Sequence, residues 1–592
     1  MHDGQFAAPD HENAPAGTPR GTGSLSDSTA WLHRADRCQS NGNLAEALAC
    51  YRKAIRLQPD LYEAYYNAGL IYQSMNRTAQ SSTCYRKALE LNPDLPQAHN
   101  NLGRLHLDAG RTAAAAGCFL QAIRRQPDFA EAHFNLGEVL RGLRRPQEAI
   151  PAFQTALRLK PSLVGAWNNL GNLLRDGGDL SGAAECFRAV VRLRPDMHEG
   201  HYNLGSTLKD TGDPQSAVTH LETARRLNPR HAESWNNLGL AHKIQGDWDE
   251  ALSCFAESIR LKPDLAAAYW NRSFVHLLHG RFREGWQDYE WRFRLPTWRR
   301  IYPYRPRRPR WDGTADPNLT VLVHDEQGLG DTLQFVRYLP EVRRRCGRVI
   351  LETRRELIPL LKDSAGVDAI VTRPQDERTP GVTADLHVPL MSLPLIFGTT
   401  GDTVPAEIPY IRPDALKSSA WGARIDGPGL KVGLVWAGRP EHQNDHNRSC
   451  RLDTFLPLSR VPGVRLYSLQ KGPAESQIAD SALRDAIVHL GPELLDFSDT
   501  AAALAHLDLL VSVDTSVAHL AGAMARPVWV LLPPIPDWRW MLDREDSPWY
   551  PTVRLFRRAA DQGWDAVMAR VALQLREVGR ERPNEQRDQT HR

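Results

Sequence analysis

The sequence of 592 residues has no apolar run of the roughly 18 residues that a membrane-spanning helix needs. Its opening stretch, MHDGQFAAPDHENAPAG, contains acidic residues and prolines and no apolar segment of a secretory signal, so we expect a cytoplasmic protein. Eight cysteines occur without a C-x-x-C pair, which gives no support to a metal or redox site. The net charge of +3 excludes a chain that binds polyanions over its whole surface.

The first half of the sequence has a period of 34 residues. Proline recurs at this spacing from Pro59 to Pro263, and glycine recurs from Gly69 to Gly239. Apolar residues lie between them at helical spacing, and cysteines that share one phase of the period are interpreted as reduced core thiols. The pattern resembles the tetratricopeptide repeat, a pair of helices in 34 residues. We expect an α-solenoid of eight units over 28–299, which start near residues 28, 62, 96, 130, 164, 198, 232 and 266.

The eighth unit has Ser273 in place of the glycine and no closing proline, which is typical of a cap or a junction. One phase of the repeat, two residues before the glycine position, is asparagine in seven of the eight units. Its members are Asn67, Asn101, Asn135, Asn169, Asn203, Asn237 and Asn271. In such arrays this phase faces the concave groove, where an amide pairs with the backbone of an extended peptide. The alternative is that asparagine is simply common at this position.

Residues 292–311, RFRLPTWRRIYPYRPRRPRW, join the two halves. Arginines mixed with aromatic residues are compatible with binding to nucleic acid or an anionic membrane. The prolines favour a stiff linker instead, with aromatic residues packed on both neighbours and arginines solvated or paired locally. We predict a basic, proline-rich linker at 300–317 and disordered tails at 1–27 and 579–592.

The second half alternates short apolar runs with helical stretches, the pattern of parallel sheets with crossover helices. A polar stretch at 413–430 divides it into two α/β lobes, 318–428 and 429–578. Ligands of such lobes bind at the carboxyl ends of the strands. The expected strands are 319–324, 348–352, 369–372, 431–436, 464–469, 509–513, 528–532 and 553–556.

The motif GLGDT follows the first expected strand and contains Gly328, Gly330 and Asp331. It is neither G-x-G-x-x-G nor a P-loop, so it gives little support to nucleotide binding. Asp331 is near the start of a helix that faces the crevice between the lobes. Its role is either to cap that helix or to act on a substrate.

The motif SVDTSVAHLAGAM begins at Ser512 and leads from an expected strand into a helix. Free N–H groups and hydroxyls at such a helix start suit a diphosphate, which makes Asp514, Thr515, Ser516 and His519 candidates for binding it. The alternatives are that Asp514 and Thr515 are helix caps and that His519 belongs to the core.

A third motif, LVWAGRPEHQNDHNRS, is a strand that ends in Gly438 and a long polar loop that carries Arg448. Such a loop at the end of a strand is typical of ligand-binding segments. Lys471 follows the next strand of the same lobe and is a further candidate for binding the donor. The histidines of the loop have no standard metal-ligand spacing, and we expect no metal. The aromatic segment 533–550 is either a wall or lid of the site, or packing between the lobes.

Together, the three motifs resemble the ADP-heptose heptosyltransferases of glycosyltransferase family 9, over about 318–578. The resemblance implies a GT-B fold of two Rossmann-like lobes and an inverting, metal-independent sugar transfer from a nucleotide donor, without a cofactor. It implies that Asp331 is the catalytic base. It also implies that Asp514, Thr515 and His519 bind the donor diphosphate, with Ser516 in place of the usual glycine. Arg448 matches a basic residue that contacts the donor.

Three hypotheses follow for the whole chain. In the first, the repeats recruit the acceptor, a protein or peptide, to a heptosyl- or hexosyltransferase. In the second, the enzyme acts on a surface saccharide and the repeats serve assembly. In the third, the lobes are inactive and the chain is a scaffold for protein–protein interaction. We expect neither a nucleic-acid partner nor a transmembrane segment.

Overall fold

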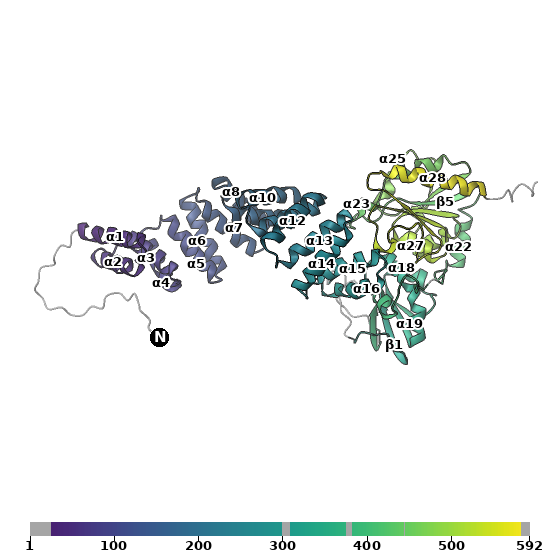
Figure 1. The fold of residues 1–592 in the computed structure, drawn as a ribbon, viewed down its shortest axis with the longest axis horizontal. Coiled ribbons are helices and arrows are strands. Elements are labelled where there is room, and N and C mark those ends of the chain that lie inside the picture. The colour runs from purple at the N-terminus through teal and green to yellow at the C-terminus, as the bar shows by residue number, and fades with distance from the viewer. Residues whose placement is uncertain (1–24, 299–307, 374–381, 406, 443, 582–592) are drawn as a thin grey trace, which may run out of the picture. The chain divides into compact units, whose positions relative to one another are not determined.

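The computed structural model describes residues 25–298, 308–373, 382–405, 407–442 and 444–581 (Figure 1). The chain divides into two compact units, Met1–Leu227 and Asn228–Arg592. Most of the predicted tails and the first part of the predicted linker lie outside the described residues. None of the described helices is long and apolar enough to cross a membrane.

The described part of the first unit, from Leu25, consists of six pairs of antiparallel helices. The pairs are α1 (Leu25–Ser40) with α2 (Leu44–Leu57), α3 (Tyr62–Ser74) with α4 (Thr78–Leu91), α5 (Pro96–Asp108) with α6 (Thr112–Arg125), α7 (Ala130–Gly142) with α8 (Pro146–Leu159), α9 (Val164–Asp176) with α10 (Leu180–Leu193), and α11 (His198–Asp210) with α12 (Pro214–Leu227). From α3 onward, the first helix of each pair begins at the residue that the period predicts. The α-solenoid prediction is therefore confirmed.

The repeated glycine explains why the two helices of a pair lie so close. A Cβ atom added at Gly137 would lie 2.7 Å from the ring of Phe153 on the next helix, and one at Gly69 would lie 2.7 Å from the ring of Tyr85. Only a residue without a side chain allows this approach. The aromatic residues are fully buried, so each glycine–aromatic contact forms a small local core.

The second unit contains two further helix pairs and two α/β lobes. The pairs are α13 (Ala232–Gln245) with α14 (Trp248–Leu261), and α15 (Ala266–Leu278) with α16 (Phe282–Tyr289), which continues into the 3₁₀ turn η1 (Glu290–Arg294). The amino-terminal lobe has strands β1 (Asp316–His324), β2 (Cys346–Thr353), β3 (Ala369–Thr372) and β4 (Leu386–Pro389). Its helices are α18 (Leu329–Phe335), α19 (Leu339–Arg345), α20 (Ile358–Leu361) and α21 (Leu393–Ile396).

The carboxyl-terminal lobe follows α22 (Ala415–Gly422). Its strands are β5 (Leu430–Val435), β6 (Val464–Ser468), β7 (Ile487–His489), β8 (Leu509–Val513), β9 (Val528–Leu532) and β10 (Val553–Arg557). Its helices are α23 (Asp445–Arg448), α24 (Leu456–Ser459), α25 (Gln477–Asp480), α26 (Phe497–Leu504), α27 (Ser516–Ala523) and α28 (Trp564–Glu581). β8 and β9 are buried along their whole length, as expected for strands that are covered on both faces.

Both sheets are parallel throughout, with strand orders β3-β2-β1-β4 and β10-β9-β8-β5-β6-β7. The order reverses between β1 and β4 in the first sheet and between β8 and β5 in the second. Ligands of open parallel sheets bind beyond the carboxyl ends of the strands at such reversals. The loops after β1, β5 and β8 therefore lie where a ligand is expected, and these loops carry the three sequence motifs.

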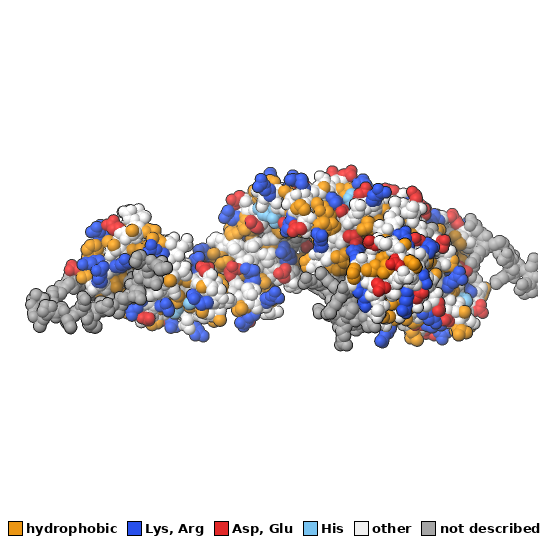
Figure 2. Space-filling model, turned by 90° about the horizontal axis from the view of Figure 1, so that it is seen from below, with side chains coloured by type: hydrophobic (Ala, Val, Ile, Leu, Met, Phe, Trp, Pro, Cys, Tyr) orange, Lys and Arg blue, Asp and Glu red, His pale blue; other side chains and the backbone are white. Residues whose placement is uncertain are grey.

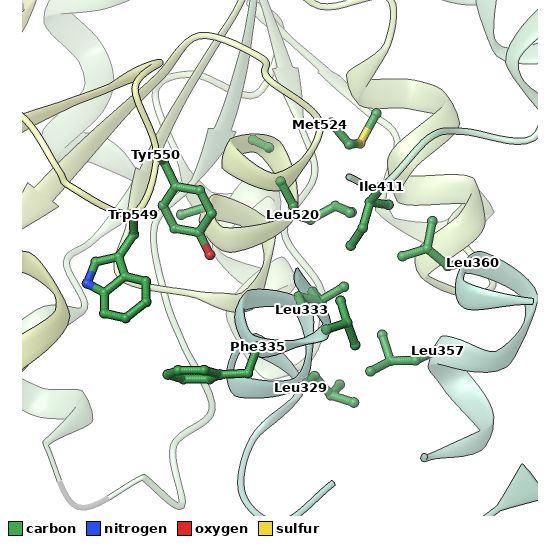
Figure 3. Packing of buried hydrophobic residues seen from close by; sticks show 14 of the residues in the cluster. Leu329, Leu333, Phe335, Leu357, Leu360, Ile411, Leu520, Met524, Trp549 and Tyr550 are labelled. Carbon is green, nitrogen blue, oxygen red and sulfur yellow. The ribbon is translucent and has the colours of Figure 1, made fainter. Parts of the chain in front are cut away.

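All eight expected strands are present, which confirms the α/β assignment of the GT-B-like region. β4 and β7 are additional edge strands that were not predicted. The two lobes share one core, in which α18 packs against α27 and the side chains of Leu333, Leu520 and Tyr550 lie close together (Figure 3). On the surface in Figure 2, positive and negative side chains are interspersed, in agreement with the low net charge.

Candidate functional site

The loop after β1 places Asp331 in the first turn of α18. Gly328 caps this helix, and its N–H donates to the Asp331 carboxylate at 2.6 Å. A Cβ atom at Gly330 would lie 2.9 Å from the imidazole ring of His519. Gly330 thus allows α18 of one lobe to contact α27 of the other, and it brings the first and second motifs together. Asp331 both caps its helix and lies at the junction of the lobes.

The second motif forms a tight polar group at the start of α27. Thr515 is the N-cap residue, and its hydroxyl lies 3.0 Å from that of Ser512. Ser516 is the first residue of the helix. The Nε2 atom of His519 lies 3.7 Å from the Asp514 carboxylate, its Nδ1 lies 3.1 Å from the Tyr550 hydroxyl, and its ring stacks on Trp540. The side chain of His519 is therefore held in one orientation at the interface of the lobes.

The pKa of Asp514 is lowered despite its burial. Burial acts to raise this pKa, but the hydrogen bond with His519 and the charges of His519 and Arg448 outweigh it. Asp514 is therefore anionic at neutral pH, with the charge of the Arg448 guanidinium nearby. A diphosphate placed here would meet the N-terminus of α27 and the Arg448 guanidinium.

The third motif lies beside the second. Arg448, the last residue of α23, donates from Nη1 to the Asp514 carbonyl at 3.1 Å and pairs with Asp445 at 3.2 Å. Gly438 donates its N–H to the Ser449 hydroxyl at 2.9 Å, which closes the polar loop. This arrangement brings Arg448 next to the start of α27, where the strand order reverses. Lys471 is held elsewhere, because its ammonium donates to the Gly491 carbonyl at 2.8 Å.

A hollow of about 690 Å³ opens beside the polar loop of the third motif. Its lining includes Gly438, Asp445, Ser449, Gln477 and Trp564. A volume of this size is in the usual range for small-molecule sites, about 300–1,000 Å³. Among the described residues, no cluster of three or more His, Cys, Asp or Glu side chains is arranged to hold a metal.

Arg539 belongs to this site but was missed in the sequence. Its guanidinium pairs with Asp331, with Asp537 at 2.8 Å and with the Gln334 side chain at 2.7 Å. Burial acts to lower the pKa of Arg539, but the charges of Asp537 and Asp331 raise it above its ordinary value. The sequence shows only an arginine between two tryptophans, and its partner Asp331 is 208 residues away.

The aromatic segment 533–550 packs between the lobes. Trp538, Trp540, Trp549 and Tyr550 are all buried, and the ring of Trp549 contacts that of Phe335, with ring centroids 5.7 Å apart (Figure 3). The segment therefore packs between the lobes, and its role as a wall or lid of the site stays a prediction. A further buried acid, Glu352, lies at the carboxyl end of β2. Burial raises its pKa to about 8 against the effect of Arg373, and neither carboxylate oxygen has a hydrogen-bond partner in the described part of the chain.

The asparagine phase of the repeats makes contacts between successive units. Asn135 donates to Asn100 at 2.8 Å, Asn203 donates to Asn168 at 2.9 Å, and Asn271 donates to Asn236 at 2.9 Å. Asn169 donates to Glu138, Asn67 to Asp36 and Asn101 to Tyr66. These amides therefore have a structural role between repeats. An amide has further donor and acceptor capacity, so peptide binding stays a prediction.

Comparisons with known proteins agree with both halves of this description. Tetratricopeptide-repeat profiles match residues 35–76, 62–95, 84–116, 101–164, 168–208 and 202–266. The profile of glycosyltransferase family 9 (heptosyltransferase) matches residues 464–540. That match contains the second motif and Arg539 and ends before α28.

The chain is also similar to Protein FlbA of Caulobacter vibrioides, with 28% identity over 325 residues that cover 50% of this chain and 53% of FlbA. It therefore spans about half the length of this relative. Among solved structures, YrrB, described as a TPR protein with an unusual peptide-binding site, is 27% identical over 31% of this chain and 95% of its own, with a TM-score of 0.29. Pseudomonas aeruginosa PilF is 20% identical over 37% and 97%, with a TM-score of 0.32. The chain thus matches tetratricopeptide-repeat profiles in its first half and the glycosyltransferase family 9 profile in part of its second half.

Proposed function

We propose that the protein is a glycosyltransferase that moves a sugar from a nucleotide-sugar donor to an acceptor hydroxyl, with inversion and without a metal. One observation carries the proposal: Gly330 brings the Asp331 turn of one lobe against His519 of the other. The two motifs come from different sheets and meet where ligands of parallel sheets bind. The family match over 464–540 supports the same chemistry.

In the proposed reaction, Asp331 accepts the proton of the acceptor hydroxyl as its oxygen attacks the anomeric carbon. The bond from this carbon to the diphosphate oxygen breaks, and the electron pair leaves with the nucleoside diphosphate. Attack from the face opposite the leaving group inverts the anomeric centre. The charge on the leaving group is stabilised by the N-terminus of α27, with Thr515 and Ser516, and by Arg448. Lys471 would need to release Gly491 to contribute.

The ion pair with Arg539 bears on the role of Asp331. The Arg539 guanidinium pairs with the carboxylate that is proposed to act as the general base. The same contact occupies one carboxylate oxygen and the Gly328 N–H occupies the other. Binding of acceptor must therefore displace or share one of these contacts. This occupancy is the observation that favours the alternative of an inactive scaffold.

For the acceptor, we propose recruitment by the repeats, because the groove phase presents polar amides at a regular 34-residue spacing. A protein or peptide in extended conformation would meet one amide in each unit. An acceptor that is a surface saccharide, with the repeats used for assembly, is the competing proposal. The two differ in whether substitutions in the groove change transfer.

The first experiment is a binding panel of ADP, GDP, UDP and their sugar derivatives, measured by thermal shift and calorimetry. We expect one nucleotide to stabilise the wild type and to lose its effect in His519→Ala. His506→Ala is the matched control, because His506 lies in the same lobe and hydrogen-bonds to Ser418, away from the motifs. Absence of binding by every nucleotide to folded protein would contradict the transferase proposal.

A further inference from the structure

The last repeat inserts an arginine into the amino-terminal lobe. Arg292, in η1, is fully buried, and its Nε and Nη2 atoms each lie 2.9 Å from one oxygen of the Glu326 carboxylate. Glu326 lies in the loop between β1 and α18, two residues before the cap of α18. A two-pronged contact of this kind fixes both distance and orientation. The last repeat is thus bonded to the loop that leads into the Asp331 turn.

The remaining donors of Arg292 are also occupied. Nη1 donates to Glu290 at 2.7 Å, and Nη2 donates to the Ser392 hydroxyl at 2.7 Å. Glu326 in turn accepts from the Met391 N–H at 3.1 Å. Burial acts to lower the pKa of Arg292, but the charges of Glu326 and Glu290 raise it above its ordinary value. These hydrogen bonds of Arg292 therefore connect the last repeat either to the amino-terminal lobe or to Glu290 in the same 3₁₀ turn, η1.

The next loop residue is held by the same repeat. Gln327 donates from its side-chain amide to the hydroxyl of Tyr289 at 2.7 Å, and Tyr289 is buried. Gly328 follows directly, and its N–H holds the Asp331 carboxylate. Two consecutive residues of the loop are thus bonded to side chains of the repeat, immediately before the turn that positions the proposed base.

A second route from the repeat reaches Asp331 through aromatic rings. Trp286 of α16 contacts Trp538 edge to face, with ring centroids 5.2 Å apart. Trp538 lies under the Arg539 guanidinium at 4.2 Å, and Arg539 pairs with Asp331. The repeat therefore supports Asp331 from the loop side and from the carboxyl-terminal lobe.

We propose that Arg292 and Tyr289 are positioning residues for Asp331, so that the last repeat is a built-in part of the transferase site. This inference rests on the proposed function. A buried ion pair is a poor source of stability, since apolar residues of equal volume often do as well or better. Positioning of the loop therefore explains this buried ion pair better than a contribution to stability does. The transferase unit then begins within the repeats, in agreement with a compact unit that starts at Asn228.

The test uses the full chain with Arg292→Lys, which keeps the charge and loses the fork, and Tyr289→Phe, which loses one hydroxyl. The control is Arg272→Lys, because Arg272 makes a similar two-pronged pair with Asp288 inside the same repeat and away from the loop. Hydrogen exchange is followed in peptides that cover 326–335, with α28 (Trp564–Glu581) as the internal reference. Nucleotide release is measured with ADP-heptose and with ADP-, GDP- and UDP-linked hexoses, and donor affinity by calorimetry.

We expect Arg292→Lys to speed exchange in 326–335 and to lower kcat about 100-fold with unchanged donor Kd, since a shift of about 1 Å costs that much. Tyr289→Phe should show a smaller loss of the same kind, and Arg272→Lys neither change. Unchanged exchange in 326–335, or faster exchange with unchanged kcat, would overturn the inference. If the wild type releases no nucleotide from any donor, the proposed function fails, while the exchange data still decide whether the repeat holds the loop.

Discussion

The contacts inside the repeats of the first unit differ in kind from the contacts inside the lobes of the second unit. In the repeats, a glycine packs against an aromatic ring of the next helix at Gly69, Gly103, Gly137 and Gly171, and against Leu221 at Gly205. The charged side chains there form exposed pairs such as Arg145–Glu148. In the lobes, single contacts that never recur join distant segments, such as Arg539 with Asp331. A recurring local contact spreads stability evenly along an array. A contact that occurs once positions a group, so its loss should change chemistry more than stability.

The largest expected effect is at Asp331. Asp331→Asn keeps the size of the side chain and removes its ability to accept a proton. We expect sugar transfer to fall about 10²–10⁴-fold, the usual contribution of a general base, with nucleotide affinity unchanged. Transfer is measured with the donor that the binding panel selects. Wild-type turnover in Asp331→Asn would contradict the role of this residue and leave it as a helix cap.

The buried carboxyl group of Glu352 should make the stability of the protein depend on pH. Its folded pKa of about 8 lies above the ordinary 4.5, so the folded state keeps a proton that the unfolded chain loses. Stability is therefore full below pH 4.5 and falls as pH rises to 8. Glu352→Gln should remove this fall and add up to about 3 kcal/mol at pH 7, at 1.36 kcal/mol per unit.

The measurement is chemical denaturation of the full chain at pH 5 and pH 7.5, followed by tryptophan fluorescence. Glu356→Gln, at an exposed position four residues later, is the control and should leave the pH dependence unchanged. If the free energy of unfolding changes equally between the two pH values in wild type and Glu352→Gln, then Glu352 is paired in solution.

Two glycines give the sharpest comparison between the regions. Alanine at Gly137 would meet Phe153 at 2.7 Å, and alanine at Gly330 would meet His519 at 2.9 Å. Overpacking of this kind costs about 1–3 kcal/mol in either place. Only Gly330→Ala should also lose nucleotide binding and turnover, because it displaces His519. Equal activity in the two variants at matched thermal stability would contradict a role for Gly330 in positioning the site.

Groove substitutions should have smaller effects. Asn135→Ala and Asn169→Ala each remove a contact between repeats, worth about 1 kcal/mol. If the repeats recruit the acceptor, transfer to a protein or peptide acceptor falls several-fold while hydrolysis of the donor is unchanged. Asn172→Ala is the control, because Asn172 lies in the same helix as Asn169 but outside the asparagine phase. Unchanged transfer would favour the competing proposal, in which the repeats serve assembly.

Metal removal should have the smallest effect. We expect turnover to be unchanged when EDTA is added, because the N-terminus of α27 and Arg448 supply the stabilisation of the leaving group that a metal supplies elsewhere. Full loss with EDTA and recovery with Mg²⁺ or Mn²⁺ would contradict a metal-independent reaction.

Much of the fold could be predicted because its signals are local. The 34-residue period places helix starts such as Tyr62 and Ala266, and runs such as LLVSV and VWVLL specify buried parallel strands. β7 was missed because it has only three residues at an edge, and β4 because its run LHVP is short and ends in proline.

The proposed site was only partly accessible to the same reasoning. Motifs that follow strands indicated Asp331, Asp514 and Arg448, because parallel sheets bring the carboxyl ends of their strands to one edge. Arg539 and Arg292 gave no such signal. Each is an arginine among aromatic residues whose partner lies far along the chain, so only the folded structure pairs them.

The most direct measurement is the position of a nucleoside diphosphate in a crystal structure of the full chain. The diphosphate is predicted to lie at the N-terminus of α27, with its oxygens near the Thr515 hydroxyl, the Ser516 N–H and the Arg448 guanidinium. The terminal phosphate should then face Asp331 across the junction of the lobes. A diphosphate bound away from α27, such as beside Trp564, or no binding of ADP, GDP or UDP at all, would contradict a transferase site built from these motifs.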